Sequence, residues 1–200
     1  EAASKDFDLG NVGAGYGATA GSLKGGLGSV SAVTDDGIQV GAIMGVNPFG
    51  SVVMPGTNAF WAWPWEVNGE FGGVQPQKDA PTADDINPFQ VMIDHGVGNT
   101  TIGVVATNVA LDKAQAKRVA IMAQDGIARA IRPVHTPVDG DTIFVLSTAQ
   151  REPAEPSVAA VGQIGMMAAD CVARAIARGV FAAEHLGDFP GYREQHNGQI

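Results

Sequence analysis

An unbroken apolar run from Thr100 to Thr107 is the feature of this sequence that most restricts its fold. A run of this kind, without a charged residue, is typical of a β-strand buried on both faces. Gly98-Asn99 comes directly before it and is typical of a turn, so we expect the strand to begin at Thr100. A helix capped by Asp112 follows, in which small apolar residues recur at three- and four-residue steps. We therefore expect this helix to pack on a sheet.

Other periodic segments predict the rest of that sheet and a second helix. Val30–Thr34 and Ile38–Val46 predict a β-hairpin, because Asp35-Asp36-Gly37 joins them as a turn. Three further elements are expected: an additional strand of the same sheet at Ser51–Met54, a strand at Thr142–Ser147 and a long helix at about Ser157–His185. The order strands, loop, strand, helix, strand, helix favours sheet layers covered by helices over an all-β sandwich or a helical bundle.

The long segment Pro55–Pro88 has no periodicity and is rich in Pro, Gly, Asn and Trp. Such a loop is expected to line a binding site. Trp61, Trp63 and Trp65 alternate with Ala and Pro inside it. They form either an apolar wall for a substrate or an anchor that fixes the loop on the core.

Composition limits the classes of function. With 200 residues, 45% of them hydrophobic, the chain is expected to form one domain, residues 1–200, that needs no metal or disulfide. Its net charge of -9, without a cluster of Lys or Arg, weighs against binding to nucleic acids and to anionic membranes. No apolar run reaches the length of a membrane span, and a cytoplasmic location is expected. The single cysteine, Cys171, is expected to be a buried and inert thiol.

Two motifs are partial matches to cofactor or metal sites, and both lack the required context. Gly13–Ala18 fits a loose dinucleotide-binding pattern, but neither the hydrophobic strand before it nor the helix after it is present. Asp139-Gly140-Asp141 has too few histidines or acidic residues nearby to complete a metal shell. We therefore expect neither a cofactor nor a bound metal.

The junction Gly98-Asn99-Thr100-Thr101 has three interpretations. It is an acceptor for N-glycosylation, an ordinary polar turn that enters a strand, or a site of self-cleavage. In the third case the Thr100 hydroxyl attacks the Asn99 carbonyl, and hydrolysis of the resulting ester leaves Thr100 with a free α-amine. That amine would then serve as the base for its own hydroxyl.

Four other polar side chains have both a structural and a catalytic interpretation. Lys24 is either a solvated loop residue or a cation beside the nucleophile. Asn47 is either a turn residue or an oxyanion donor. Asp139 and Asp141 belong either to a simple turn or to a pair that holds an N-terminal ammonium and the threonine hydroxyl. His135 is expected to be structural.

Taken in order, these motifs resemble the L-aminopeptidase/D-esterase family, which includes β-peptidyl aminopeptidases and endo-type nylon-oligomer hydrolases. The resemblance covers about Gly10 to Arg193 and rests on four segments: Gly13–Lys24, Val46–Pro48, Gly98–Thr101 and His135–Thr142. It implies an α/β (α+β) fold, an α-β-β-α layered sandwich of the type shared with ornithine acetyltransferases. Family members carry a substantial segment ahead of the glycine-rich loop, so the resemblance leads us to expect that this part of the family's fold is absent from the sequence.

For the active site, the resemblance implies that Thr100 is the nucleophile and that Asn99 precedes the cut. By similarity, Lys24 lies near the nucleophile and Asn47 belongs to the oxyanion site. Asp139 and Asp141 match the pair that supports the nucleophile.

For the whole protein, the resemblance implies a self-cleaving amide hydrolase processed into residues 1–99 and 100–200. Its partners would be a small peptide or amide substrate, such as a 6-aminohexanoate oligomer, and further copies of itself in a homo-oligomer, a tetramer of processed protomers. Two alternatives stay open. One is an acyltransferase of the ornithine acetyltransferase type, and the other is an inactive fragment that binds peptides.

Overall fold

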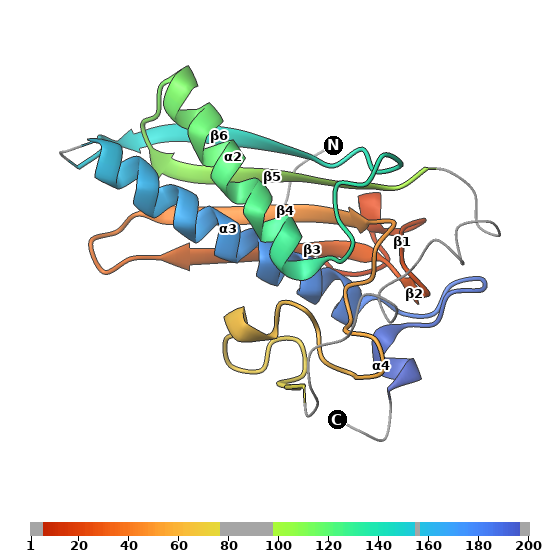
Figure 1. Ribbon diagram of the computed structural model, residues 1–200. Coiled ribbons are helices and arrows are strands. Elements are labelled where there is room, and N and C mark those ends of the chain that lie inside the picture. The colour runs from red at the N-terminus through yellow and green to blue at the C-terminus, as the bar shows by residue number, and fades with distance from the viewer. Residues whose placement is uncertain (1–5, 77–97, 155–156, 197–200) are drawn as a thin grey trace.

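Four long strands and two long helices make up most of the chain in the computed structural model, which describes residues 6–76, 98–154 and 157–196 (Figure 1). The strands are β3 (Gly26–Val33), β4 (Gln39–Asn47), β5 (Thr100–Val109) and β6 (Thr142–Arg151), and they form one sheet in the order β3-β4-β5-β6. β3, β4 and β5 pair antiparallel, whereas β5 and β6 pair parallel. A parallel pair needs a crossover, which the helix between β5 and β6 supplies.

The two helices, α2 (Lys113–Ala130) and α3 (Ser157–Ala182), lie together on one face of the sheet (Figure 1). α3 packs on β3 and β4, and α2 packs on β6. Smaller elements surround this frame: η1 (Gly13–Gly15), β1 (Thr19–Ala20), β2 (Leu23–Lys24), η2 (Trp63–Trp65) and α4 (Tyr192–Gln195). The mixed α/β class expected from the sequence is confirmed. The described residues supply one helix layer and one sheet layer of the four layers expected.

Local signals fixed the ends of several elements. The hairpin β3–β4 turns at Asp35-Asp36-Gly37, as predicted, and Gly37 has a φ of 87°, a value that favours glycine. Asp112 caps α2 in a capping box, because its carboxylate accepts from the Gln115 amide at 2.8 Å and the Gln115 side chain accepts from the Asp112 amide at 2.9 Å.

The expectation of a further strand at Ser51–Met54 is wrong. This segment makes only isolated bridges, from Ser51 to Arg132 and from Val53 to Phe60. Within the described residues the sheet contains β3, β4, β5 and β6 alone, so this segment is not one of its strands.

α3 is the central helix of the core. A Cβ atom on Gly28 would lie 1.8 Å from the Ala175 carbonyl oxygen, so this glycine lets β3 approach the helix closely. Cys171 is buried in α3, and burial raises the pKa of its thiol to about 11, which makes it inert as expected. α3 is also long enough and apolar enough to cross a membrane, with a mean hydropathy of 1.2, but 67% of that window is buried inside the molecule. These are the properties of a core helix.

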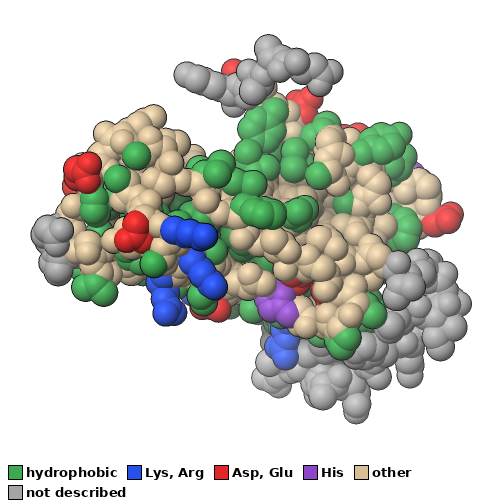
Figure 2. Space-filling view, turned by 90° about the horizontal axis from the view of Figure 1, so that it is seen from above, with side chains coloured by type: hydrophobic (Ala, Val, Ile, Leu, Met, Phe, Trp, Pro, Cys, Tyr) green, Lys and Arg blue, Asp and Glu red, His purple; other side chains and the backbone are tan. Residues whose placement is uncertain are grey.

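The other face of the sheet is largely uncovered, which corrects the prediction that Thr100–Thr107 is buried on both faces. Burial alternates along β5, where Thr101, Gly103 and Val105 are buried but Ile102 is 43% exposed. Phe144 and Leu146 of β6 are 55% and 57% exposed. Hydrophobic side chains gather in the upper part of the space-filling view (Figure 2). An apolar run cannot by itself distinguish two covered faces from one covered and one apolar but open face.

Candidate active site

The sheet register brings three of the predicted motifs to one end of the sheet. Asn47, the last residue of β4, pairs with Thr100, the first residue of β5. On the other side of β5, Asn99 forms a parallel bridge with Asp139, and β6 begins at Thr142. Thr100 therefore lies between Asn47 and the Asp139–Asp141 segment, although these residues are far apart in the sequence.

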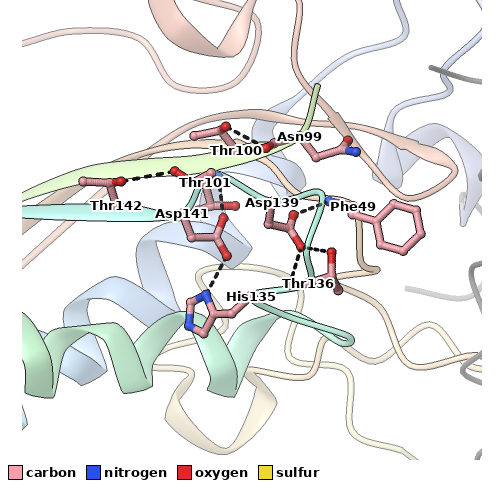
Figure 3. Close-up of polar contacts among 10 residues, drawn as sticks. Phe49, Asn99, Thr100, Thr101, His135, Thr136, Asp139, Asp141 and Thr142 are labelled. Carbon is pink, nitrogen blue, oxygen red and sulfur yellow. Dashed lines mark hydrogen bonds and ion pairs between the residues drawn. The ribbon is translucent and has the colours of Figure 1, made fainter. Parts of the chain in front are cut away.

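The Thr100 hydroxyl lies directly against the peptide bond that precedes it. Its Oγ1 atom donates to the Asn99 carbonyl oxygen at 2.6 Å (Figure 3). The same oxygen accepts a second hydrogen bond, from the Gly140 amide at 2.9 Å. The hydroxyl is thus adjacent to a carbonyl that already receives two hydrogen bonds, which is a suitable arrangement for attack by the oxygen on the carbonyl carbon.

The two carboxylates are held by neighbours other than Thr100 (Figure 3). Asp141 is 3% exposed, and its oxygens accept from the Thr101 amide at 2.8 Å and meet His135 Nδ1 at 2.7 Å. Asp139 accepts from the Thr136 amide and hydroxyl at 2.9 and 2.6 Å. It also accepts from the Phe49 amide at 3.1 Å. Both aspartates are therefore fixed beside the Thr100 backbone, and among the described residues the partners of their carboxylates do not include the Thr100 hydroxyl.

Asn47 is held through both the oxygen and the nitrogen of its side-chain amide. Its Oδ1 atom accepts from the Thr19 amide at 2.9 Å, and its Nδ2 atom donates to the Gly98 carbonyl oxygen at 3.0 Å. The side-chain amide is thus orientated by the glycine-rich loop and directed at the segment before Thr100. Its donor is occupied by the chain itself.

Lys24 is buried, at 1% exposure, and all three of its N–H groups donate to backbone carbonyls. The acceptors are the carbonyl oxygens of Gly15, Ala18 and Gly25, at 2.7, 2.8 and 2.8 Å. Desolvation by burial lowers the pKa of this lysine. With its donors used in this way, the ammonium group does not contact Thr100 but holds the glycine-rich loop that lies beside it.

A cavity of about 270 Å³ opens next to Thr100. It is lined by the glycine-rich loop and the ends of β4 and β5, through Ala14, Gly17, Ala18, Gly45, Asn47, Thr100 and Ile102. No charged side chain is among these residues, and Asn47 and Thr100 supply the polar side chains of the lining.

The three tryptophans lie elsewhere, as none of them lines this cavity. Arg129 stacks on the Trp65 ring at 5.1 Å, and Arg132 stacks on the Trp61 ring at 4.8 Å. These contacts tie the loop to α2 and to the segment after it, as in the anchoring interpretation. The remainder of that loop, from residue 77, lies outside the described residues.

Sequence reasoning missed two contacts at this site. His135 is expected to be structural, and no signal in the sequence indicated that it pairs with Asp141, which also accepts from the Thr101 amide. Gly140 was considered only as part of a turn, although its amide bonds the Asn99 carbonyl. The glycine between two aspartates was the available signal, because a small residue at that point permits a close approach of two backbones. Among the described residues, no group of three His, Cys, Asp or Glu could hold a metal ion.

Comparison with known proteins gives consistent matches. The sequence model of peptidase family S58 matches residues 1–193. An uncharacterized aminopeptidase of Mycobacterium tuberculosis is 41% identical over 98% of this chain and 59% of its own length. A 6-aminohexanoate-oligomer endohydrolase of Paenarthrobacter ureafaciens is 30% identical over 72% of this chain and 40% of its own length.

Solved structures match over nearly the whole chain. The L-aminopeptidase D-Ala-esterase/amidase of Ochrobactrum anthropi, described as a variant of the Ntn hydrolase fold, has a TM-score of 0.62 and 25% identity over 94% of this chain and 48% of its own. A β-aminopeptidase of a Burkholderia species has a TM-score of 0.61 and 20% identity over 92% of this chain and 51% of its own. The chain thus spans about half the length of these proteins.

Proposed function

The chain belongs to peptidase family S58, and from this premise we propose that it is an amide hydrolase that cuts itself between Asn99 and Thr100 and then uses Thr100 as its nucleophile. The observation that carries the proposal is the 2.6 Å contact between the Thr100 hydroxyl and the Asn99 carbonyl oxygen. The hydroxyl is next to the bond that it must attack, at the start of a strand that is paired on both sides.

Self-cleavage would create the catalytic base. An unperturbed α-amine has a pKa of about 7.7–8.0, so a substantial fraction of it is neutral near pH 7 and can accept the hydroxyl proton. The buried Asp141 carboxylate accepts a hydrogen bond from the amide of Thr101, the residue next to this amine. Its negative charge would therefore lie close to the ammonium form of Thr100. Thr100 would then supply both the nucleophile, its hydroxyl, and the base, its α-amine.

Asn47 would become available in the same event. Its Nδ2 atom donates to the Gly98 carbonyl in the uncut chain, and that carbonyl belongs to the segment released from Thr100. With the segment displaced, the amide can donate to the carbonyl oxygen of a substrate in the adjoining cavity. Thr100 Oγ1 attacks the substrate carbonyl, the amine product leaves with a proton from the Thr100 ammonium, and water then hydrolyses the ester to release the acid.

We propose that the substrates are peptides or small amides that place their acyl group in this cavity. Amides of amino acids, β-amino acids and 6-aminohexanoate are the substrates to test, since each is the named substrate type of a related protein. The two-piece organisation, residues 1–99 and 100–200, and assembly into a homo-oligomer are parts of the same proposal.

The test is the intact mass of the purified full-length protein with N-terminal sequencing. We expect a second chain that begins Thr-Thr-Ile-Gly and hydrolysis of at least one of the three amide classes. Thr100→Ala should stay in one piece and inactive, whereas Thr100→Ser, which keeps a hydroxyl, should still be cut. Correctly folded wild-type protein that remains uncut and hydrolyses none of the amides would disprove the proposal.

A further inference from the structure

The Asn99 carbonyl oxygen accepts a hydrogen bond from a backbone amide that lies between the two aspartates. Gly140 donates its amide hydrogen to this oxygen at 2.9 Å, while the Thr100 hydroxyl donates at 2.6 Å. During attack of Thr100 Oγ1 on the Asn99 carbon, negative charge develops on this same oxygen. A donor already in place there lowers the barrier, because it needs no reorganisation.

The Gly140 amide is fixed by the residues on both sides of it. Asp139 is bound through its carboxylate to the Thr136 amide and hydroxyl, and Asp141 is bound to the Thr101 amide and His135 (Figure 3). The parallel bridge between Asn99 and Asp139 sets the register of the two backbones. The two aspartates therefore position the amide between them.

Space, and not a special backbone angle, explains glycine at this position. Gly140 is absent from the residues with positive φ, so an L side chain would fit its backbone conformation. A Cβ atom there would lie 2.6 Å from Thr100 Oγ1, however, which is closer than real Cβ contacts allow. Only glycine lets the amide reach the Asn99 carbonyl while the hydroxyl keeps its place.

The Asn47 side-chain amide donates to a neighbouring carbonyl and not to the Asn99 carbonyl. Its Nδ2 atom is bound to the Gly98 carbonyl oxygen, one residue before the oxygen on which charge develops. Resting on the proposed function, we infer that the Gly140 amide is the oxyanion donor of self-cleavage, and that the oxyanion donor of substrate turnover is a different group, Asn47.

The step balances as follows. Thr100 Oγ1 forms a bond to the Asn99 carbonyl carbon, the bond from that carbon to the Thr100 nitrogen breaks, and the hydroxyl proton ends on the nitrogen, which becomes the α-amine. Water then adds to the ester carbon and the bond to Oγ1 breaks; one proton of the water restores the Thr100 hydroxyl, the other protonates the new α-amine, and Asn99 becomes a carboxylate. The Gly140 amide serves the same oxygen in both stages and is unchanged at the end.

Replacing Gly140 by glycolic acid tests this directly, because the resulting backbone ester lacks the N–H but adds no side chain. The matched control is glycolic acid in place of Gly56, whose amide has no hydrogen-bond partner within residues 6–76, 98–154 and 157–196. We expect the ester at Gly140 to slow self-cleavage by about 10²-fold or more relative to the ester at Gly56. Equal cleavage rates, within threefold, would overturn the inference.

Three further measurements keep the result interpretable. Gly140→Ala should also slow cleavage, whereas Gly162→Ala, at a position with no atom within 4 Å of the new Cβ, should not. Hydroxylamine, which cleaves an accumulated ester, should not accelerate formation of the chain that begins at Thr100 in Gly140→Ala, a variant without a backbone ester of its own. Rapid release by hydroxylamine would mean that the first attack proceeds normally, and the inference would be wrong.

Asn47→Ala provides the complementary arm, and it should reduce turnover by the cut protein more than it reduces the rate of cutting. The reverse order would overturn the division between the two donors. A wild-type protein that is never cut would refute the proposed function itself. If the wild type is cut and the variant with glycolic acid at position 140 is cut equally fast, only this inference is refuted.

Discussion

Replacing Lys24 by methionine should loosen the glycine-rich loop that forms one wall of the cavity. The lysine is buried and its ammonium group joins three carbonyls, of Gly15, Ala18 and Gly25, into one cluster. Methionine fills much of the same volume but donates no hydrogen bond. The change therefore removes the polar contacts and leaves the packing largely intact.

The expected loss follows from those contacts. A hydrogen bond to a charged group contributes about 1.5–3 kcal/mol, so three of them sum to roughly 5–9 kcal/mol. Desolvation of the ammonium group opposes this by several kcal/mol. We expect a net loss of about 2–4 kcal/mol in the free energy of unfolding, which corresponds to a melting temperature lower by about 5–15 °C for a chain of this size.

Urea and thermal unfolding of the Thr100→Ala background measure this loss without interference from self-cleavage. Lys117→Met is the control, because Lys117 lies exposed on α2 and the same chemical change there should alter stability by less than about 0.5 kcal/mol. A Lys24→Met protein as stable as this control would refute the argument, since it would mean that the three carbonyls gain nothing from the ammonium group.

Three further outcomes are expected. Asn47→Asp keeps the shape of the side chain but replaces the N–H donor that faces Gly98 with a carboxylate, so kcat of the cut fraction should fall by about 10²–10³-fold in a steady-state amide assay. Asp141→Asn keeps an acceptor for the Thr101 amide but removes the charge, so amide turnover should fall by about 10²-fold while the melting temperature stays within a few degrees of wild type. Burial lowers the pKa of Lys24 below its ordinary value of 10.5, so the unfolded chain binds this proton more tightly than the folded chain. The free energy of unfolding of the wild type should therefore rise relative to that of Lys24→Met as the pH increases towards 10.5, as measured by urea unfolding across that range. A difference in stability between the two proteins that narrows instead would contradict the direction of the pKa shift.

The parts of the fold that depend on neighbouring residues could be predicted from the sequence. Asp35-Asp36-Gly37 indicated a tight turn, and Asp112 indicated the start of α2, because turn and cap residues act on backbone groups within a few positions. The burial of β5 could not be predicted in the same way. Its apolar residues are equally compatible with a covered or an open second face, and the answer depends on what else packs there.

The candidate site was found only in part, for a related reason. The resemblance selected Thr100, Asn47 and both aspartates, and the sheet register then showed that they share one end of the sheet. The contacts that define their roles are long-range. Lys24 holds the glycine-rich loop through backbone carbonyls, and Gly140 donates to the Asn99 carbonyl through its backbone amide. Every residue except proline has both groups, so the sequence does not indicate which of them will pair.

If the chain is cut at Asn99-Thr100 as we propose, the strands of one sheet are divided between the two pieces. β4 lies on one side of the cut and β6 on the other, and α3 from the second piece packs against β3 and β4 from the first. The two pieces would thus form an obligate heterodimer that shares a single interior. Once denatured, such a pair must find each other again by diffusion, so recovery would depend on protein concentration, whereas the unprocessed chain could refold alone.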